Sequence, residues 1–286
     1  MNAAWIFVKM NRVTYTLLIL LSFFLVGCSS SDHPFPLDLQ QKGEYLYRMH
    51  DEYHFKIPPP EFVKAQRYVW ERNLTGGLPK ITKEYFRCKG SNLNPVRIVQ
   101  NEKEVKHCYD CGGSEKHSLP LKGGEEFIYP ILIDLLNDLQ EQTHCKVVIT
   151  CGHSCPEHHT YSDSTNQNLY SKHMIGAEVA FYVQGMENSP QVIAQLIQDY
   201  YKKNEKYENK NEYTFFQTYD KGDTQVTTKP LFNKEIFLKI YKANEGRNFD
   251  NRHPYPYLAI QVRYDFDLKT KVVYTWNLAH RNYLRW

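Results

Sequence analysis

The chain has 286 residues, of which 35 are basic and 32 acidic, and a formal net charge of +3. A charge so close to neutral argues against the nucleic-acid-binding class, and no nucleic-acid partner is expected. The length suits one large domain with its own hydrophobic core, and a second domain is not required.

The first 27 residues have the three zones of a bacterial lipoprotein signal peptide. Lys9 and Arg12 supply a basic stretch, residues 13–26 form an apolar run, and Leu25-Val26-Gly27-Cys28 closes the segment. The apolar run is shorter than the roughly 20 residues that span a bilayer, and it ends in small residues that suit a peptidase. We therefore expect cleavage before Cys28.

Cys28 is the predicted lipid-attachment site, because a cysteine here can receive the acyl chains that hold a protein stably on a membrane. The alternative is an ordinary secretory signal with an incidental cysteine. Ser29 replaces the Asp that favours inner-membrane retention, so the outer membrane of the cell envelope is the preferred location. Residues 28–43 are polar and contain two prolines, a composition typical of a tether.

The folded part is expected to begin near Glu44 and to have two sections. Residues 44–115 form an aromatic- and cysteine-containing N-terminal elaboration, with a helix over 61–73 and strand-like or loop-like sequence over 80–115. Residues 116–286 form the main domain. Its first helix is predicted over 125–142, because one face carries the apolar residues Ile128, Ile131, Leu132, Leu135, Leu136 and Leu139.

The rest of the main domain alternates strands and helices. Strands are predicted over 146–150 and 177–183, on either side of a long polar loop rich in His, Ser and Asn. Ser189-Pro190 has the pattern of a helix start. A C-terminal hairpin is expected to pair 257–264 with 271–276. Helices before and between antiparallel strands predict an α+β fold.

Six further cysteines belong to a chain that leaves the reducing cytosol: Cys88, Cys108, Cys111, Cys145, Cys151 and Cys155. Up to three disulfides are the default expectation, and six sites allow fifteen full pairings. Two alternatives remain open. Cys108 and Cys111 have the spacing of a redox pair, and with Cys88 they could form part of a zinc knuckle assisted by His107 or His117.

The most informative stretch contains Cys151-Gly152-His153-Ser154, followed after a loop by Ser171-Lys172-His173-Met174-Ile175-Gly176-Ala177-Glu178-Val179-Ala180. It resembles the M15 family of zinc metallopeptidases, which are D,D-carboxypeptidases and cell-wall endopeptidases. That family has a strand ending in Ser-Gly-Tyr-Arg-Ser and a later motif, Ser-x-His-x-x-Gly-x-Ala-x-Asp. The resemblance covers residues 125–185 well and the C-terminal hairpin loosely. It implies a Hedgehog/D,D-peptidase-like antiparallel sheet flanked by helices.

In that family, the His of the later motif, the Asp seven residues after it and a His on a late strand bind zinc, with an open position for water. Ser171, His173 and Gly176 fit this pattern. Ala180 stands in place of the Asp and cannot bind a metal. Glu178 lies on the same strand face and is the alternative ligand, or else a strand residue that hydrogen-bonds the loop.

Other positions of the resemblance also depart from the family. The substrate-binding Arg corresponds to Ser154, which cannot pair with a carboxylate as a guanidinium does. His153 stands where the family often has Tyr. The residues expected to line the ligand cleft are His153, Ser154, Ser171, Ala180 and Ala259.

The third zinc ligand has two possible registers. The first aligns residues 257–263 with the late strand and places Ala259 in the ligand position. The second aligns residues 276–280, keeps His280, and puts Asn277 in place of the catalytic Glu. An amide cannot take a proton from metal-bound water, so each register lacks an essential group.

Abandoned catalysis explains these losses more simply than three separate replacements. The leading prediction is a cell-envelope lipoprotein that binds peptidoglycan stem peptide or a protein partner without cleaving it. The enzyme alternative is a zinc D,D-carboxypeptidase or endopeptidase with His173, Glu178 and His280 as ligands, and zinc is expected only in that case. A third alternative is a structural surface lipoprotein.

Overall fold

The computed structural model describes residues 72–100, 105–163, 165, 170–222, 224 and 226–286. All of them belong to one compact unit, Gln66–Trp286. The boundary predicted at residue 115 lies within this unit. The signal peptide, Cys28, the tether and most of the helix expected over 61–73 lie outside the described residues. No helix among the described residues is long and apolar enough to cross a bilayer.

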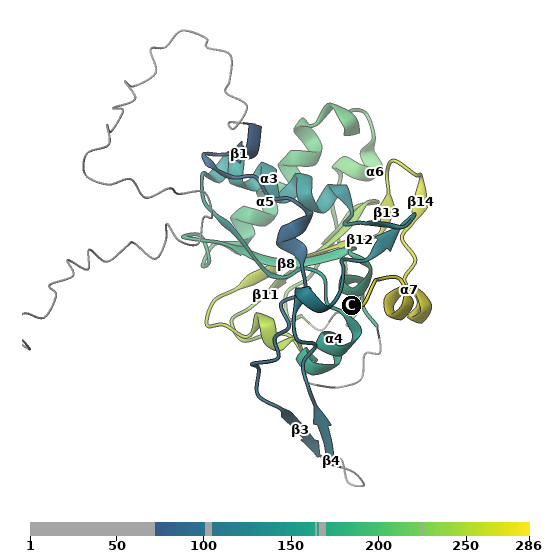
Figure 1. Ribbon diagram of the computed structural model, residues 1–286. Helices are drawn as coiled ribbons and strands as arrows, with labels where there is room; N and C mark the ends of the chain where they lie inside the picture. The colour runs from purple at the N-terminus through teal and green to yellow at the C-terminus, as the bar shows by residue number, and fades with distance from the viewer. Residues whose placement is uncertain (1–71, 101–104, 164, 166–169, 223, 225) are drawn as a thin grey trace, which may run out of the picture. The chain divides into compact units, whose positions relative to one another are not determined.

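A six-stranded antiparallel sheet organises this unit (Figure 1). Its strands lie in the order β7 (Val147–Cys151), β8 (Glu178–Val183), β12 (Tyr257–Val262), β11 (Ile236–Tyr241), β10 (Leu231–Phe232) and β9 (Gln217–Thr218). The three central strands are rich in β-branched and aromatic residues, which pack well on a pleated surface. Because side chains alternate along each strand, the sheet has two chemically different faces.

Helices α3 (Pro130–Thr143) and α5 (Pro190–Lys203) pack on one face (Figure 1). Proline occupies the first turn of both helices, where a missing N–H leaves no hydrogen bond unmade. The main core lies between these helices and the sheet, and it includes Leu132, Leu136, Val179, Phe181 and Ile260. Burying each such side chain stabilises the fold by roughly 1.5–3 kcal/mol.

The fold is α+β, as the order of elements predicts, but some boundaries differ from the expectation. Residues 125 and 126 form β6 (Glu125–Glu126), paired with β5 (Leu121–Lys122), and α3 starts only at Pro130. Proline is well suited to the first helical turn, which explains the later start. Ser189 does precede α5, but its side chain makes no capping hydrogen bond.

The C-terminal hairpin is smaller than predicted. Its strands are β13 (Tyr264–Asp265) and β14 (Thr270–Lys271), whereas β12 pairs with β8 and β11 in the large sheet. Trp276 begins the helix α7 (Trp276–Arg281) instead of ending a strand. The hydrophobic pattern of β12 indicates a strand but not its partner, and the partner was therefore predicted wrongly.

The other elements are short and lie around both faces of the sheet. The chain before α3 forms β1 (Leu74–Thr75), β2 (Leu78–Pro79), η2 (Lys83–Phe86), β3 (Arg97–Gln100), β4 (Val105–Cys108) and η3 (Ser114–Lys116). The β3–β4 hairpin extends away from the sheet, and its base lies near α4 (Pro156–Ser162) (Figure 1). The remaining short helices are η4 (Lys172–Ile175), η5 (Glu205–Tyr207), α6 (Asn211–Thr214) and η6 (Phe249–Asn251).

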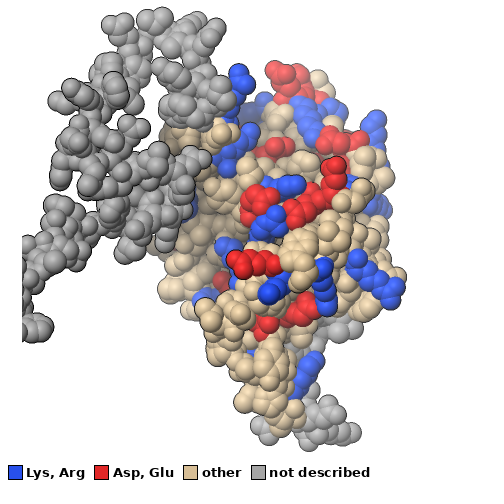
Figure 2. Space-filling model, viewed as in Figure 1, with Lys and Arg blue, Asp and Glu red and all other residues tan. Residues whose placement is uncertain are grey.

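Charges on the face shown in Figure 2 are mixed. Basic and acidic side chains are interspersed there, and neither sign forms a continuous patch. This distribution agrees with the near-neutral composition of the chain.

Candidate functional site

A cleft of about 570 Å³ lies over the sheet face opposite α3 and α5. Its floor comes from β8, β12 and β11, and its walls come from η4, the loop after α4 and the segments around β9, β10 and η6. Among the described residues, its lining includes Ser171, Lys172, His173, Glu178, Ala180, Lys239, Tyr241, Arg247, Tyr257, Ala259, Gln261 and Arg263.

Two alanines meet on the cleft floor. Ala180 of β8 is the direct cross-strand partner of Ala259 of β12, and both are almost fully buried. The same row continues to Cys151 on one side and Lys239 on the other. The two positions that the resemblance assigns to metal ligands are therefore neighbours, and both carry a methyl group that cannot bind a metal.

His173 points its two ring nitrogens at different partners. Nδ1 lies 2.7 Å from the carbonyl oxygen of Gly152, so Nδ1 carries the proton and donates it. Nε2 lies 3.7 Å from Oε1 of Glu178. Gly176 ends η4 in the left-handed conformation, with φ 69°, and a side chain there would collide with the carbonyl oxygen of Phe127.

Buried Glu178 and partly buried His173 form a pair of opposite charge. Burial lowers the pKa of His173, but Cys151 and Glu178 outweigh burial and raise it to about 10. Burial raises the pKa of Glu178, but His173 and Lys239 outweigh it, and the net shift is downward. Gln261 also donates a hydrogen bond to Oε1 of Glu178 over 2.8 Å. The carboxylate thus has partners without a metal.

His280 does not join this pair. It lies on α7 rather than on a strand, its ring stacks on Trp276, and it is not among the residues that line the cleft. The sets of three or more potential metal ligands found among the described residues do not include His173, Glu178 or His280. The structure brings together two of the three ligands expected for the enzyme.

His153 and Ser154 lie beneath the cleft instead of lining it. Each is 1% exposed, and the N–H of His153 donates to the carbonyl oxygen of Phe86 over 2.6 Å. The end of η2 therefore covers this loop. Burial, together with the charges of nearby histidines, lowers the pKa of His153 to about 3, so its ring is neutral at physiological pH.

Cationic side chains line the cleft. Lys239 and Arg247 line it, and neither forms a salt bridge with any described residue. Lys172 donates to the carbonyl oxygen of Val262 over 2.7 Å, and burial lowers its pKa to about 8. Tyrosine and phenylalanine side chains complete the walls, so the cleft combines positive charge with aromatic surface.

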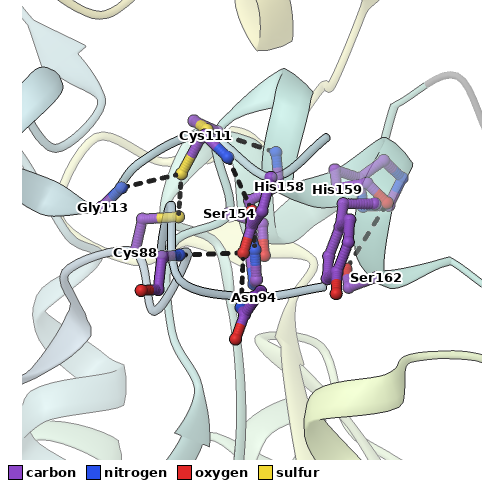
Figure 3. Close-up of polar contacts among 12 residues, drawn as sticks. Cys88, Asn94, Cys111, Gly113, Ser154, His158, His159 and Ser162 are labelled. Atoms are coloured by element: carbon purple, nitrogen blue, oxygen red, sulfur yellow. Dashed lines mark hydrogen bonds and ion pairs between the residues drawn. The ribbon is translucent and has the colours of Figure 1, made fainter. Parts of the chain in front are cut away.

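The six described cysteines are free in this structure, and none of the expected disulfides is formed among them. Cys88 Sγ and Cys111 Sγ approach to 3.8 Å (Figure 3), which is well beyond the bond length of about 2.05 Å in a disulfide. Cys88, Cys111, His117 and Cys155 instead gather with their ligand atoms all within 4.8 Å of one another. We call these four residues the Cys–His cluster.

The zinc-knuckle alternative named only some of these residues. Cys88, Cys111 and His117 are in the Cys–His cluster, whereas Cys108 and the exposed His107 are not. Cys155 was not assigned to that group. Nothing local in the sequence indicates its membership, because it arrives from the loop between β7 and α4 and meets the others only in the folded chain.

His158 is a buried ionic brace next to the cluster. Nδ1 lies 2.8 Å from Asp110 and Nε2 lies 2.7 Å from Asp250. Burial lowers the pKa of His158, but hydrogen bonds to the two carboxylates raise it to about 10. Asp110 also accepts from the N–H of Ser91 and from Asn94. The brace therefore ties α4 to the loops around Cys111 and η6.

No family model, curated protein sequence or solved structure matches this chain.

Proposed function

We propose that this chain is a cell-envelope lipoprotein whose cleft binds peptidoglycan stem peptide without cleaving it. One observation carries the proposal: Ala180 and Ala259 face each other on the cleft floor beside His173. In the resembled peptidases, these positions supply two of the three zinc ligands. A cleft that has methyl groups at these positions is suited to binding and lacks two of the ligands that would hold a water-activating zinc ion.

The Hedgehog/D,D-peptidase-like architecture is part of this proposal. It is supported by the antiparallel sheet with helices on one face, and by the position of the Ser171–Gly176 motif directly before β8. It is also supported by the pairing of Ala180 with Ala259, because the register that aligns residues 257–263 requires these two positions to be adjacent.

The chemistry of the cleft suits a peptide with both charges. A stem peptide ends in a carboxylate and carries an amino group on its diamino acid. Arg247 and Lys239 offer cations for the carboxylate, since a guanidinium can form two parallel hydrogen bonds with it. Asp163 adds a carboxylate to the lining of the cleft.

The enzyme alternative is favoured by the short distance between His173 and Glu178. A zinc peptidase would need a third ligand and a general base near this pair. Ala180 and Ala259, which pair with each other on the floor, and Gln261, which pairs with Glu178, cannot serve as a general base. Binding without hydrolysis is therefore the better supported function.

Attachment to the envelope is tested by mass spectrometry of the mature protein. We expect a chain that begins at Cys28 and carries acyl groups on the cysteine. An unmodified N-terminus at any other residue would refute lipidation.

Binding is tested with purified sacculi and a full-length Cys28→Ser variant, which removes the lipid as a cause of sedimentation. The variant should co-sediment with sacculi and release no D-alanine from a synthetic stem peptide. Ala259→Arg, which fills the floor, should abolish co-sedimentation. Lys106→Ala on the exposed hairpin serves as the matched control, because it removes a cation outside the cleft.

The possible outcomes separate the three functions. D-alanine release that disappears in His173→Ala would establish the enzyme and overturn the proposal. Failure to bind sacculi, together with no turnover, would leave a structural surface lipoprotein or a lipoprotein with a protein partner. Binding that survives Ala259→Arg would show that the binding surface lies outside the cleft.

A further inference from the structure

The four side chains of the Cys–His cluster come from separate parts of the chain and converge on one point. Cys88 follows η2, Cys111 lies in the loop after β4, His117 ends η3, and Cys155 precedes α4. Three of them are buried, and Cys111 is half-buried. Three thiols and an imidazole in this arrangement form an S₃N donor set.

The distance between sulfurs fits a shared metal ion. Zinc binds thiolates at about 2.3 Å, and two ligands of a tetrahedron are then about 3.8 Å apart. Cys88 Sγ and Cys111 Sγ are 3.8 Å apart. This spacing is that of two ligands of one zinc ion, and it is too long for a disulfide.

The two ring nitrogens of His117 have different surroundings. Nδ1 lies 3.1 Å from the carbonyl oxygen of Ser118, to which it can donate, whereas Nε2 is buried and the Cys111 thiol is the side chain within the cluster that interacts with the ring. His117 is 3% exposed, so water does not freely satisfy this atom. A carbonyl that fixes the proton on one nitrogen and leaves the other for a metal is the usual arrangement of a metal-binding histidine.

The backbone around the cluster donates to the sulfurs. The N–H of Gly113 lies 3.4 Å from Cys111 Sγ (Figure 3), and the N–H of His158 lies 3.4 Å from Cys155 Sγ. Such bonds stabilise negative charge on sulfur.

Gly90 leaves room for the cluster. A Cβ at this position would lie 2.2 Å from Cys111 Sγ and 2.8 Å from a carboxylate oxygen of Asp110. Only glycine allows the backbone to pass this close to the sulfur.

We propose that Cys88, Cys111, His117 and Cys155 bind one zinc ion in a closed, structural site. Soft thiolate ligands with one imidazole select zinc, and four protein ligands leave no position for a catalytic water. The ion would fasten η2, the base of the β3–β4 hairpin and α4 to one another. It would also hold the C-terminal tail, because His117 pairs with Arg285 in a β-bridge.

This site is separate from the cleft and does not depend on the proposed function. None of its four ligands lines the cleft. The zinc expected for the enzyme alternative would bind His173, so the two sites are distinguished by which variants lose metal.

The test uses the untagged full chain, purified under reducing conditions from zinc-supplemented medium. Elemental analysis should find about one zinc per chain. Cys155→Ser and His117→Ala should lose it, whereas His117→Cys should retain it, because a fourth thiolate still completes a tetrahedron. Cys108→Ser is the matched control: Cys108 is buried and lies three positions from Cys111, but it is outside the cluster.

A second measurement avoids dependence on how well the variants fold. Co²⁺ substituted into the wild-type chain should give the visible absorption of a tetrahedral ion and a thiolate-to-cobalt charge-transfer band. Alkylation should then label Cys88, Cys111 and Cys155 only after a chelator is added.

Three results would overturn the site. They are a wild-type chain without zinc, zinc that persists in Cys155→Ser, and a Cys88–Cys111 disulfide found by mass spectrometry of the reduced-condition preparation. Zinc that is lost from His173→Ala but kept in Cys155→Ser would show that the metal binds in the cleft.

Discussion

The cleft and the Cys–His cluster share one short segment, residues 151–155, yet they offer different chemistry. Cys151 begins the segment beneath the cleft, where its Sγ lies 3.6 Å from Nδ1 of His173. Cys155 ends the segment in the cluster. The cleft is open and has alanines where the resemblance calls for ligands, whereas the cluster brings four potential metal ligands together.

This contrast changes how a metal measurement should be interpreted. Zinc in the purified protein does not by itself indicate peptidase activity, because the cluster can account for it. Each ion has to be assigned by the residues whose substitution removes it.

The largest expected effect comes from emptying the cluster. Zinc that binds only the folded chain stabilises it by about 4 kcal/mol when free zinc is a thousandfold above its Kd. Thermal unfolding with a strong chelator should therefore show a markedly lower Tm than without it. Cys155→Ser should be destabilised by a similar amount and should not respond to the chelator. A Tm that is unchanged by chelation in the wild type would contradict a structural role for the ion.

The second prediction concerns a metal site introduced into the cleft by substitution. Ala180→Asp combined with Ala259→His adds a carboxylate and an imidazole at adjacent floor positions beside His173. Metal content should rise from about one zinc per chain to about two, and a hundredfold excess over Kd should add about 2.7 kcal/mol of stability. His173→Ala in this background should remove only the second ion. If the double variant gains no metal, the alignment of residues 257–263 is wrong.

The third prediction concerns the pH dependence of stability that Glu235 causes, which is separate from the effect of losing the metal. Burial raises the pKa of Glu235 to about 7, and hydrogen bonds with Tyr207 and Tyr201 offset this shift only in part. A raised carboxyl pKa gives stability that is fully present below about pH 4.5 and is lost as the pH rises through about 7. Protonation of zinc thiolates acts in the opposite direction, because it lowers stability at acidic pH.

Glu235→Gln should therefore remove the loss of stability that accompanies rising pH. Relative to the wild type, the variant should gain on the order of 2 kcal/mol between pH 5 and pH 8 in urea unfolding. Measurements with chelator present keep the zinc term constant. A difference between variant and wild type that does not change with pH would show that Glu235 titrates normally in the folded chain.

The smallest effect concerns affinity in the cleft alone. Arg247→Ala should weaken stem-peptide binding about tenfold, which corresponds to about 1.4 kcal/mol, because one guanidinium contact with a carboxylate is lost. Its Tm and zinc content should stay unchanged, since Arg247 is outside the cluster. Titration calorimetry measures the affinity, with Lys106→Ala as the control. Equal affinity for both variants would exclude Arg247 from the binding surface.

Periodic patterns predicted the main elements and one half of the site. The leucine spacing indicated α3, Ser189-Pro190 marked the start of α5, and the motif around His173 indicated residues that do line the cleft. Each of these signals is local, because it depends on residues a few positions apart. His153 and Ser154 were misplaced because η2, from a distant part of the chain, covers them.

The sequence alone determined the α+β class, the positions of the long helices, and the absence of a metal ligand at residues 180 and 259. Only the tertiary structure decided that these two alanines are cross-strand partners and that Cys155 joins Cys88, Cys111 and His117. Side-chain identity is fixed residue by residue, but strand pairing and ligand clusters depend on which distant segments meet when the core is buried. Counting cysteines predicted cross-links, and the fold instead brought four side chains together around a common centre.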